Sequence, residues 1–269
     1  MRKQFYFFTC WIFFWFSSTV TAQPIRIEPN NTAELMQLLL KDSSQTYFVK
    51  HLPSDFPLIE DINIKKKLFL SSLIPLVESE NTRILEQRQL AAELLRNSRI
   101  LPRQDHQLWL DSLYRKYNMQ TQRDRQQLLR RVDEVPMALV LAQAAMESGW
   151  GNSRFVLHGN NLFGHWTFNK NQGIKPKHAA PNTNHYVKKF PDLRSSIRQY
   201  LHNINTNHAY RELRQWRAEM RDSHQDLDPF RLADALWRYS QMGNDYAEAL
   251  QQIMRSRMFQ ETVKLNSIN

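Results

Sequence analysis

The sequence of 269 residues contains one cysteine and only 6 glycines. Because Cys10 is the single cysteine, the chain cannot form an internal disulfide, and a thiolate zinc cluster or a cysteine nucleophile further along is also excluded. No nucleotide-binding glycine loop occurs, so an ATP-dependent role is not expected. The chain also lacks a long low-complexity tract, and its hydrophobic fraction of 42% is typical of a folded protein.

Metal-ligand patterns are missing as well. The nine histidines are scattered, and no His-Glu-x-x-His sequence is present. Four histidines lie around the loop after Glu147 and the basic hairpin, but their spacings do not define a site; these are His158, His165, His178 and His185. We therefore expect neither a metal site nor a cofactor.

The first residues have the pattern of an export signal. Arg2 and Lys3 form a positive start, Phe5 to Phe16 an apolar centre, and Val20-Thr21-Ala22 a small-residue exit before Gln23. The apolar centre has 12 residues, whereas a membrane span needs about 20. We predict a signal peptide over residues 1–22, which would remove Cys10; an uncleaved anchor is the alternative.

Positive charge is in excess. The formal net charge is +10, and removal of Arg2 and Lys3 with the signal leaves 10 − 2 = +8. For an exported protein this favours an anionic polymer of the cell envelope over nucleic acid as a partner. Basicity that serves solubility alone is the alternative.

Low glycine content and amphipathic stretches predict a mainly helical chain. Residues 23–31 look like a linker, and helices are expected over 32–40, from Lys65 to about Leu95, over 106–117 and over 121–132. Pro75 should kink or divide the second of these helices, with Asn81 as a new cap. Residues 51–62, interrupted by two prolines, should be irregular.

The second half should enclose a small β-lobe. HWTF and HYVKKF, between His165 and Phe190, read as two strands joined by a basic loop. Helices resume afterwards, with Asp228 as a cap before Pro229 and a last helix that carries Tyr246. We predict an α+β, predominantly helical protein, with a helical extension over 23–120 and a second domain over 121–262.

Glu147 occupies a position that suits acid catalysis. It ends a helix that begins near Pro136 and is followed by Ser-Gly-Trp-Gly. Burial and the negative end of the helix dipole both disfavour ionisation, so the pKa of this carboxyl should be raised. A carboxylic acid that stays protonated near neutral pH can protonate the leaving oxygen of a glycosidic bond. A capping or salt-bridged glutamate is the structural alternative.

The neighbouring sequence, AMESGWGNSRFVLHGNNLFG at 145–164, resembles the signature of the glucosaminidase family of peptidoglycan hydrolases. Its parts are the Glu147–Gly151 turn, Ser153 and the Asn160–Gly164 loop. Segments 190–210 and 239–250 are similar to later parts of that family. Upstream, LPSDFPLIEDINIKKKLFLSSLIPLVESENTRILEQR resembles the extension of the Bax-type exported proteins of Gram-negative bacteria.

This resemblance implies a lysozyme-like fold and hydrolysis of the β-1,4 bond on the reducing side of N-acetylglucosamine. It implies periplasmic peptidoglycan strands as the partner, and we expect a monomer without a membrane anchor. Glu147 matches the general acid, and Tyr239 a tyrosine near the scissile bond. Trp150 is a sugar platform or packs beneath the loop; Asn161 and Phe163 match the loop beside the cleft.

Tyr246 is a core residue or a substrate contact.

A second carboxylate is missing from the β-lobe, because no Asp or Glu occurs between Glu147 and Asp192. The lobe instead carries lysines, namely Lys170, Lys175, Lys177, Lys188 and Lys189, and Ser195 stands where relatives have Glu. Either Asp192 is a distant base in an inverting reaction, or the substrate's 2-acetamido group attacks the anomeric carbon. The second mechanism, attack by the acetamido group, needs only one protein carboxylate, and we favour it.

Two other functions are compatible with this sequence. A lytic transglycosylase would also use a lone glutamate but would release an anhydro sugar, and the Asn-Asn-Leu-Phe-Gly loop argues against it. A non-catalytic peptidoglycan-binding or scaffolding protein would not need Glu147.

Overall fold

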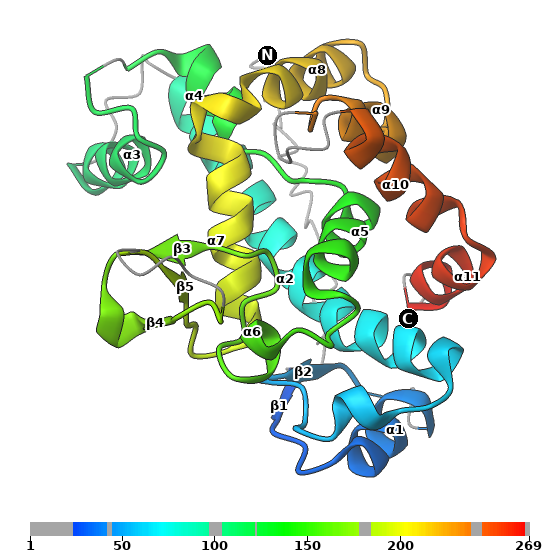
Figure 1. Ribbon diagram of the computed structural model, residues 1–269. Helices are drawn as coiled ribbons and strands as arrows, with labels where there is room; N and C mark the ends of the chain where they lie inside the picture. The colour runs from blue at the N-terminus through cyan, green and yellow to red at the C-terminus, as the bar shows by residue number, and fades with distance from the viewer. Residues whose placement is uncertain are drawn as a thin grey trace, which may run out of the picture.

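The computed structural model describes residues 24–41, 45–96, 104–121, 123–177, 184–237 and 244–266 (Figure 1). The predicted signal peptide and Tyr239 lie outside the described residues. The helices are α1 (Thr32–Lys41), α2 (Ile62–Arg96), α3 (Gln104–Lys116), α4 (Arg125–Arg131), α5 (Met137–Ser148), α6 (Arg154–Leu157), α7 (Leu193–Thr206), α8 (Arg211–Asp222), α9 (Pro229–Asp234), α10 (Asn244–Arg255) and α11 (Arg257–Asn266). The strands are β1 (Ile25–Ile27), β2 (Tyr47–Val49), β3 (Trp166–Thr167), β4 (Gly173–Ile174) and β5 (Tyr186–Lys188). The predicted α+β, mainly helical class is confirmed.

Helix α2 passes through the middle of the molecule and packs against α5, α7 and α11 (Figure 1). Its 35 residues run unbroken through Pro75. Of the two predicted effects of this proline, a kink or a division, the division is therefore wrong. Asn81 caps nothing: its side chain donates to the Val135 carbonyl at 2.8 Å and accepts from the Val135 amide at 3.3 Å. This pair of bonds ties α2 to the segment that leads into α5.

A two-stranded parallel sheet lies at one end of α2. Strand β1 pairs with β2 in the register Ile25↔Tyr47 and Ile27↔Val49. The prediction of a linker over 23–31 is therefore wrong for these residues. Three residues are too few to show the alternation by which a strand is found in a sequence, and the partner strand lies about twenty positions away.

The β-lobe is a three-stranded antiparallel sheet in the order β3-β5-β4. Trp166 pairs with Val187, and Gly173 pairs with Lys188. The two predicted strands are present at HWTF and HYVKKF, and β4 is an additional strand that the sequence did not indicate. A Cβ on Gly173 would lie 2.3 Å from Cβ of Tyr186, so this strand needs glycine to approach β5.

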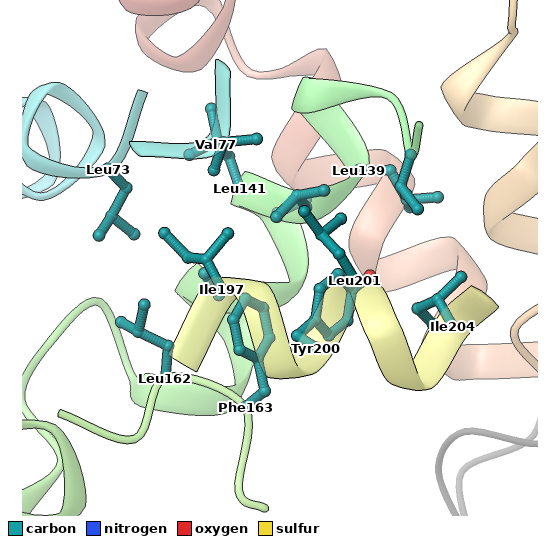
Figure 2. Packing of buried hydrophobic residues seen from close by; sticks show 14 of the residues in the cluster. Leu73, Val77, Leu139, Leu141, Leu162, Phe163, Ile197, Tyr200, Leu201 and Ile204 are labelled. Atoms are coloured by element: carbon teal, nitrogen blue, oxygen red, sulfur yellow. The ribbon is translucent and has the colours of Figure 1, made fainter. Parts of the chain in front are cut away.

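One hydrophobic core is shared by both halves of the chain. Figure 2 shows side chains of α2, α5 and α7 meeting there: Leu73, Val77, Leu139, Leu141, Ile197 and Leu201. Residues on both sides of the predicted boundary at 120/121 thus stabilise each other, while the boundary itself stays a prediction.

The helices after the β-lobe begin where their caps indicate. Asp228 accepts a hydrogen bond from the Phe230 amide at 2.8 Å, and Pro229 opens α9, as predicted. Helix α11, which the sequence analysis did not separate from α10, packs along α2. Within the described part of the chain, no helix combines the length and apolar character needed to cross a membrane.

Candidate active site

Glu147 lies in the last turn of α5, directly before a tight left-handed turn. Gly149, Trp150 and Gly151 have φ angles of 58°, 57° and 82° in succession. The Trp150 amide donates to the Ala145 carbonyl at 2.8 Å, and the Ser148 hydroxyl accepts from the Gly151 amide at 2.9 Å. These bonds end the helix and fix the position from which the Glu147 side chain projects.

Gly151 brings this turn against the extension. A Cβ at this position would stand 2.7 Å from Leu52 Cδ1 and 3.0 Å from both Phe56 Cε1 and Phe69 Cδ2. A Cβ on Gly149 would meet no atom within 4 Å, so its requirement is the positive φ angle alone. The two glycines of the motif therefore serve different purposes, and Gly151 couples the site to residues 52–69.

The Glu147 carboxyl is half-buried and accepts a hydrogen bond from the Tyr246 hydroxyl at 2.8 Å on Oε1. Burial raises the pKa of Glu147 above its usual value, and the hydrogen bond from Tyr246 opposes that rise. The direction agrees with the sequence-based expectation. A raised pKa increases the protonated fraction of the carboxyl group at a given pH, and the protonated form is the one that a general acid needs.

A chain of buried polar side chains supports this contact. Gln143 Nε2 donates to the Tyr246 hydroxyl at 3.0 Å, and the Tyr200 hydroxyl donates to Gln143 Oε1. Since the Tyr246 oxygen accepts from Gln143, its own proton is directed to Glu147. The three buried residues come from α5, α7 and α10, so this chain connects three helices behind the carboxyl.

Tyr210 is a further neighbour of the site. Burial raises the pKa of Tyr210 to about 12; a hydrogen bond with Asn203 acts against this, and the negative charge of Glu147 adds to it. The sequence analysis named Tyr246 but missed Gln143, Tyr200 and Tyr210. Gln143 could have been found, because it is the polar residue one turn before Glu147 on an otherwise apolar helix.

Asn161 and Phe163 hold the loop after α6. The Asn161 amide donates to the carbonyls of His165 and Lys188 at 2.9 and 2.8 Å, and its oxygen accepts from the amides of Phe163 and His165 at 3.3 and 3.1 Å. These four bonds use all the hydrogen-bonding positions of the side chain. Phe163 is buried and stacks on Tyr200, with ring centroids 4.0 Å apart (Figure 2). Both residues position the β-lobe and the polar chain.

Trp150 packs on the extension. Its ring lies edge-on to Phe69 at a centroid distance of 6.0 Å, and Lys66 Nζ stands 4.8 Å from the ring centroid. Of the two roles expected for Trp150, these contacts favour packing against α2.

Asp192 is the N-cap of α7. Its Oδ1 accepts from the Ser195 amide at 2.6 Å. It also lines a cavity of about 180 Å³ together with residues of the small parallel sheet, among them Arg26 and Phe48. These neighbours are different from those of Glu147, and they favour a structural role for Asp192.

The lysines of the β-lobe are mainly exposed. Lys188 is half-buried, and its Nζ lies 5.0 Å from the Phe190 ring centroid and 3.4 Å from Gln199 Oε1. The exposed members are Lys170, Lys175, Lys177 and Lys189. No group of His, Cys, Asp or Glu that could hold a metal ion occurs among the residues that the structure describes.

Comparisons with known proteins identify the family of this chain. The family model described as glucosaminidase, mannosyl-glycoprotein endo-beta-N-acetylglucosaminidase, matches residues 123–258. Protein bax of Escherichia coli (strain K12) is 28% identical over 188 residues, which are 68% of this chain and 66%, just under two thirds, of that protein. No solved structure gives a significant match. The chain is therefore similar to protein bax, and it belongs to the glucosaminidase family.

Proposed function

We propose that this protein hydrolyses the glycan strands of peptidoglycan at the β-1,4 bond on the reducing side of N-acetylglucosamine. The observation that carries the proposal is the environment of the half-buried Glu147. Burial raises the pKa of its carboxyl group, and Oε1 of that group accepts a hydrogen bond from Tyr246. The family match implies a carbohydrate substrate and supports a glycosidase. Membership alone does not give the bond that is cleaved.

In the proposed reaction, Glu147 transfers its proton to the leaving glycosidic oxygen. The 2-acetamido oxygen of the same N-acetylglucosamine attacks the anomeric carbon as the glycosidic bond breaks, which gives a cyclic oxazolinium intermediate. The Glu147 carboxylate then takes a proton from water as that water adds to the anomeric carbon. These reaction steps need only one protein carboxylate. This agrees with the role of Asp192 as the cap of α7, where it accepts a hydrogen bond from the Ser195 amide.

We assign supporting roles to other residues. Tyr246 is a positioning residue, because it orients Glu147 and biases its ionisation through one hydrogen bond. Tyr239 is proposed to place the acetamido group or the water. The exposed lysines of the β-lobe are proposed to attract the anionic polymer by screened surface charge.

Product analysis distinguishes the proposed reaction from its alternatives. Purified peptidoglycan is digested, and the fragments are identified by mass spectrometry. Hydrolysis predicts fragments that end in a reducing N-acetylglucosamine. A 1,6-anhydromuramic end would indicate a transglycosylase, and an unchanged polymer would indicate a binding protein.

The protein is also proposed to act after export, in the periplasm. The basis is the pattern of residues 1–22, with its charged start, apolar centre and small-residue exit. N-terminal sequencing of the protein purified from cells should give a start near Gln23. A start at Met1 in the membrane fraction would contradict this.

A further inference from the structure

A basic cavity lies between α2, α3 and α7, and its volume is about 360 Å³. Its walls carry three permanently or usually positive side chains, Arg83, Lys116 and Arg198. Ser195, Gln199 and His202 of α7 add hydroxyl, amide and imidazole groups. We refer to this cavity, defined by these six residues, as the α7 anion pocket.

The carboxylate nearest to this pocket is already fully engaged. Glu80 is 0% exposed and pairs with Arg83 at 2.8 Å, Arg194 at 2.6 Å and Arg198 at 2.8 Å. Burial alone would raise the pKa of Glu80, but its bonds and ion pairs with the arginines lower it to about 2. Asp192 is a second negative charge that acts on Arg198. Three guanidinium groups against these two carboxylates leave one positive charge in excess.

Lys116 adds to this excess. Its Nζ donates to Gln87 Oε1 at 3.0 Å, and no salt bridge joins it to a carboxylate among the described residues. Burial, together with the charges of Arg83 and Arg198, lowers the pKa of Lys116 to about 8, although the charge of Glu80 acts in the other direction. Burial also lowers the pKa of His202, and the positive charge of Lys116 contributes to the same decrease. Both shifts are those expected where the local potential is positive.

The pocket borders a second hollow along α7. Gln199 and His202 also line a wider hollow of about 550 Å³, which reaches Asn203. Asn203 is hydrogen-bonded to Tyr210, the tyrosine whose pKa is raised in part by the charge of Glu147. Asn203 thus connects the wider hollow to a tyrosine that lies near Glu147.

We propose that the α7 anion pocket binds a carboxylate of the peptide stem that peptidoglycan carries. Carboxylates are the anions that a glycan substrate of this kind offers, and guanidinium and ammonium groups bind them by charge-assisted hydrogen bonds. The inference rests on the proposed function for the identity of the ligand. The basic character of the pocket rests on the contacts given above.

Two variants test the pocket in opposite ways. Lys116→Gln removes a positive charge from the wall of the pocket. Ser195→Glu places a tethered carboxylate at the pocket wall, where it should compete with the ligand. The second change should not harm folding, because position 195 is in the first turn of α7, where a negative side chain interacts favourably with the helix dipole. Lys264→Gln, on the exposed face of α11, is a control with the same change in net charge.

The probe is the free stem tetrapeptide of peptidoglycan, compared with the same peptide whose carboxyl groups are converted to methylamides. Binding to the full chain is measured by NMR titration at low salt. The wild-type protein and Lys264→Gln should bind the acid form about three- to tenfold more tightly than the amide form. Both pocket variants should lose that preference.

Equal binding of the two peptides by the wild-type protein, or an unchanged preference in both pocket variants, would overturn the proposal. Because the probe contains no sugar, this result is independent of catalysis. A preference for the acid form together with no digestion of peptidoglycan would leave the pocket valid and contradict the proposed function. Digestion of peptidoglycan without a preference for the acid form would support the proposed function and overturn the proposed role of the pocket.

Discussion

The Tyr246 hydroxyl donates a hydrogen bond of 2.8 Å to Glu147 Oε1, although 99 positions separate the two residues in the sequence. The contact joins the last turn of α5 to α10. It is the one hydrogen bond that lowers the pKa of a carboxyl group whose burial raises it. The ionisation of Glu147 is therefore set by two opposed effects, one of which can be removed by deleting a single oxygen atom.

Replacement of Tyr246 by Phe should change the pH dependence of activity. The hydrogen bond stabilises the ionised form of Glu147, so its loss raises the pKa of this group. A general acid must be protonated, and its activity falls as the pH rises through its pKa. The alkaline limb of the pH–rate profile should therefore move to higher pH in Tyr246→Phe.

The same substitution should also reduce stability, because it leaves the buried Gln143 amide without its acceptor. We expect a loss of about 1–3 kcal/mol in the free energy of unfolding, measured with urea. Tyr114→Phe, at a buried tyrosine of α3, is the matched control and should leave the pH profile unchanged. An alkaline limb that stays in place, or moves to lower pH, in Tyr246→Phe would contradict this account of Glu147.

Substitutions of Asp192 should separate a helix cap from a catalytic base. Asn retains an oxygen that accepts from the Ser195 amide, whereas Ala does not. Asp192→Ala should thus cost about 1 kcal/mol of stability, and Asp192→Asn less. In substrate-assisted hydrolysis, both proteins should keep most of their turnover where they are folded. If Asp192→Asn were folded and as inactive as a Glu147 variant, an inverting mechanism with Asp192 as base would be correct.

The two glycines that follow Glu147 should differ in their tolerance of alanine. Gly149→Ala meets only the cost of a left-handed backbone, about 1–2 kcal/mol. Gly151→Ala has that cost and also drives a methyl group into Leu52, Phe56 and Phe69, which adds about 1–3 kcal/mol. Chemical denaturation of the two proteins measures the difference. Equal losses, or a larger loss for Gly149→Ala, would mean that the turn does not depend on the extension.

Local signals in the sequence were enough for much of the fold. The apolar period of α7 and the Asp228 cap each lie within one element, so both could be predicted. Pro75 misled the prediction because its ring removes one backbone donor, while the thirteen buried residues of α2 hold the helix together. Strand β4 has two residues and can show no period at all.

The candidate site was predictable to a similar extent. The place of Glu147 before a glycine turn follows from adjacent residues. The links from Gln143 to Tyr200 and Tyr246 depend on how α5, α7 and α10 pack, and a single sequence does not contain that information. Asn161 was expected beside the substrate, but the four bonds of its side chain depend on the register of β5 against the loop.

The central claim, that Glu147 is the acid which cleaves the glycan, is tested most directly by Glu147→Gln. The measurement is the rate at which reducing N-acetylglucosamine ends are released from purified peptidoglycan, with circular dichroism as the check on folding. Glutamine keeps the shape of the side chain but has no proton to transfer, so the rate should fall by about 10²–10⁴-fold or more. A folded Glu147→Gln protein that releases these ends at the wild-type rate would contradict the account.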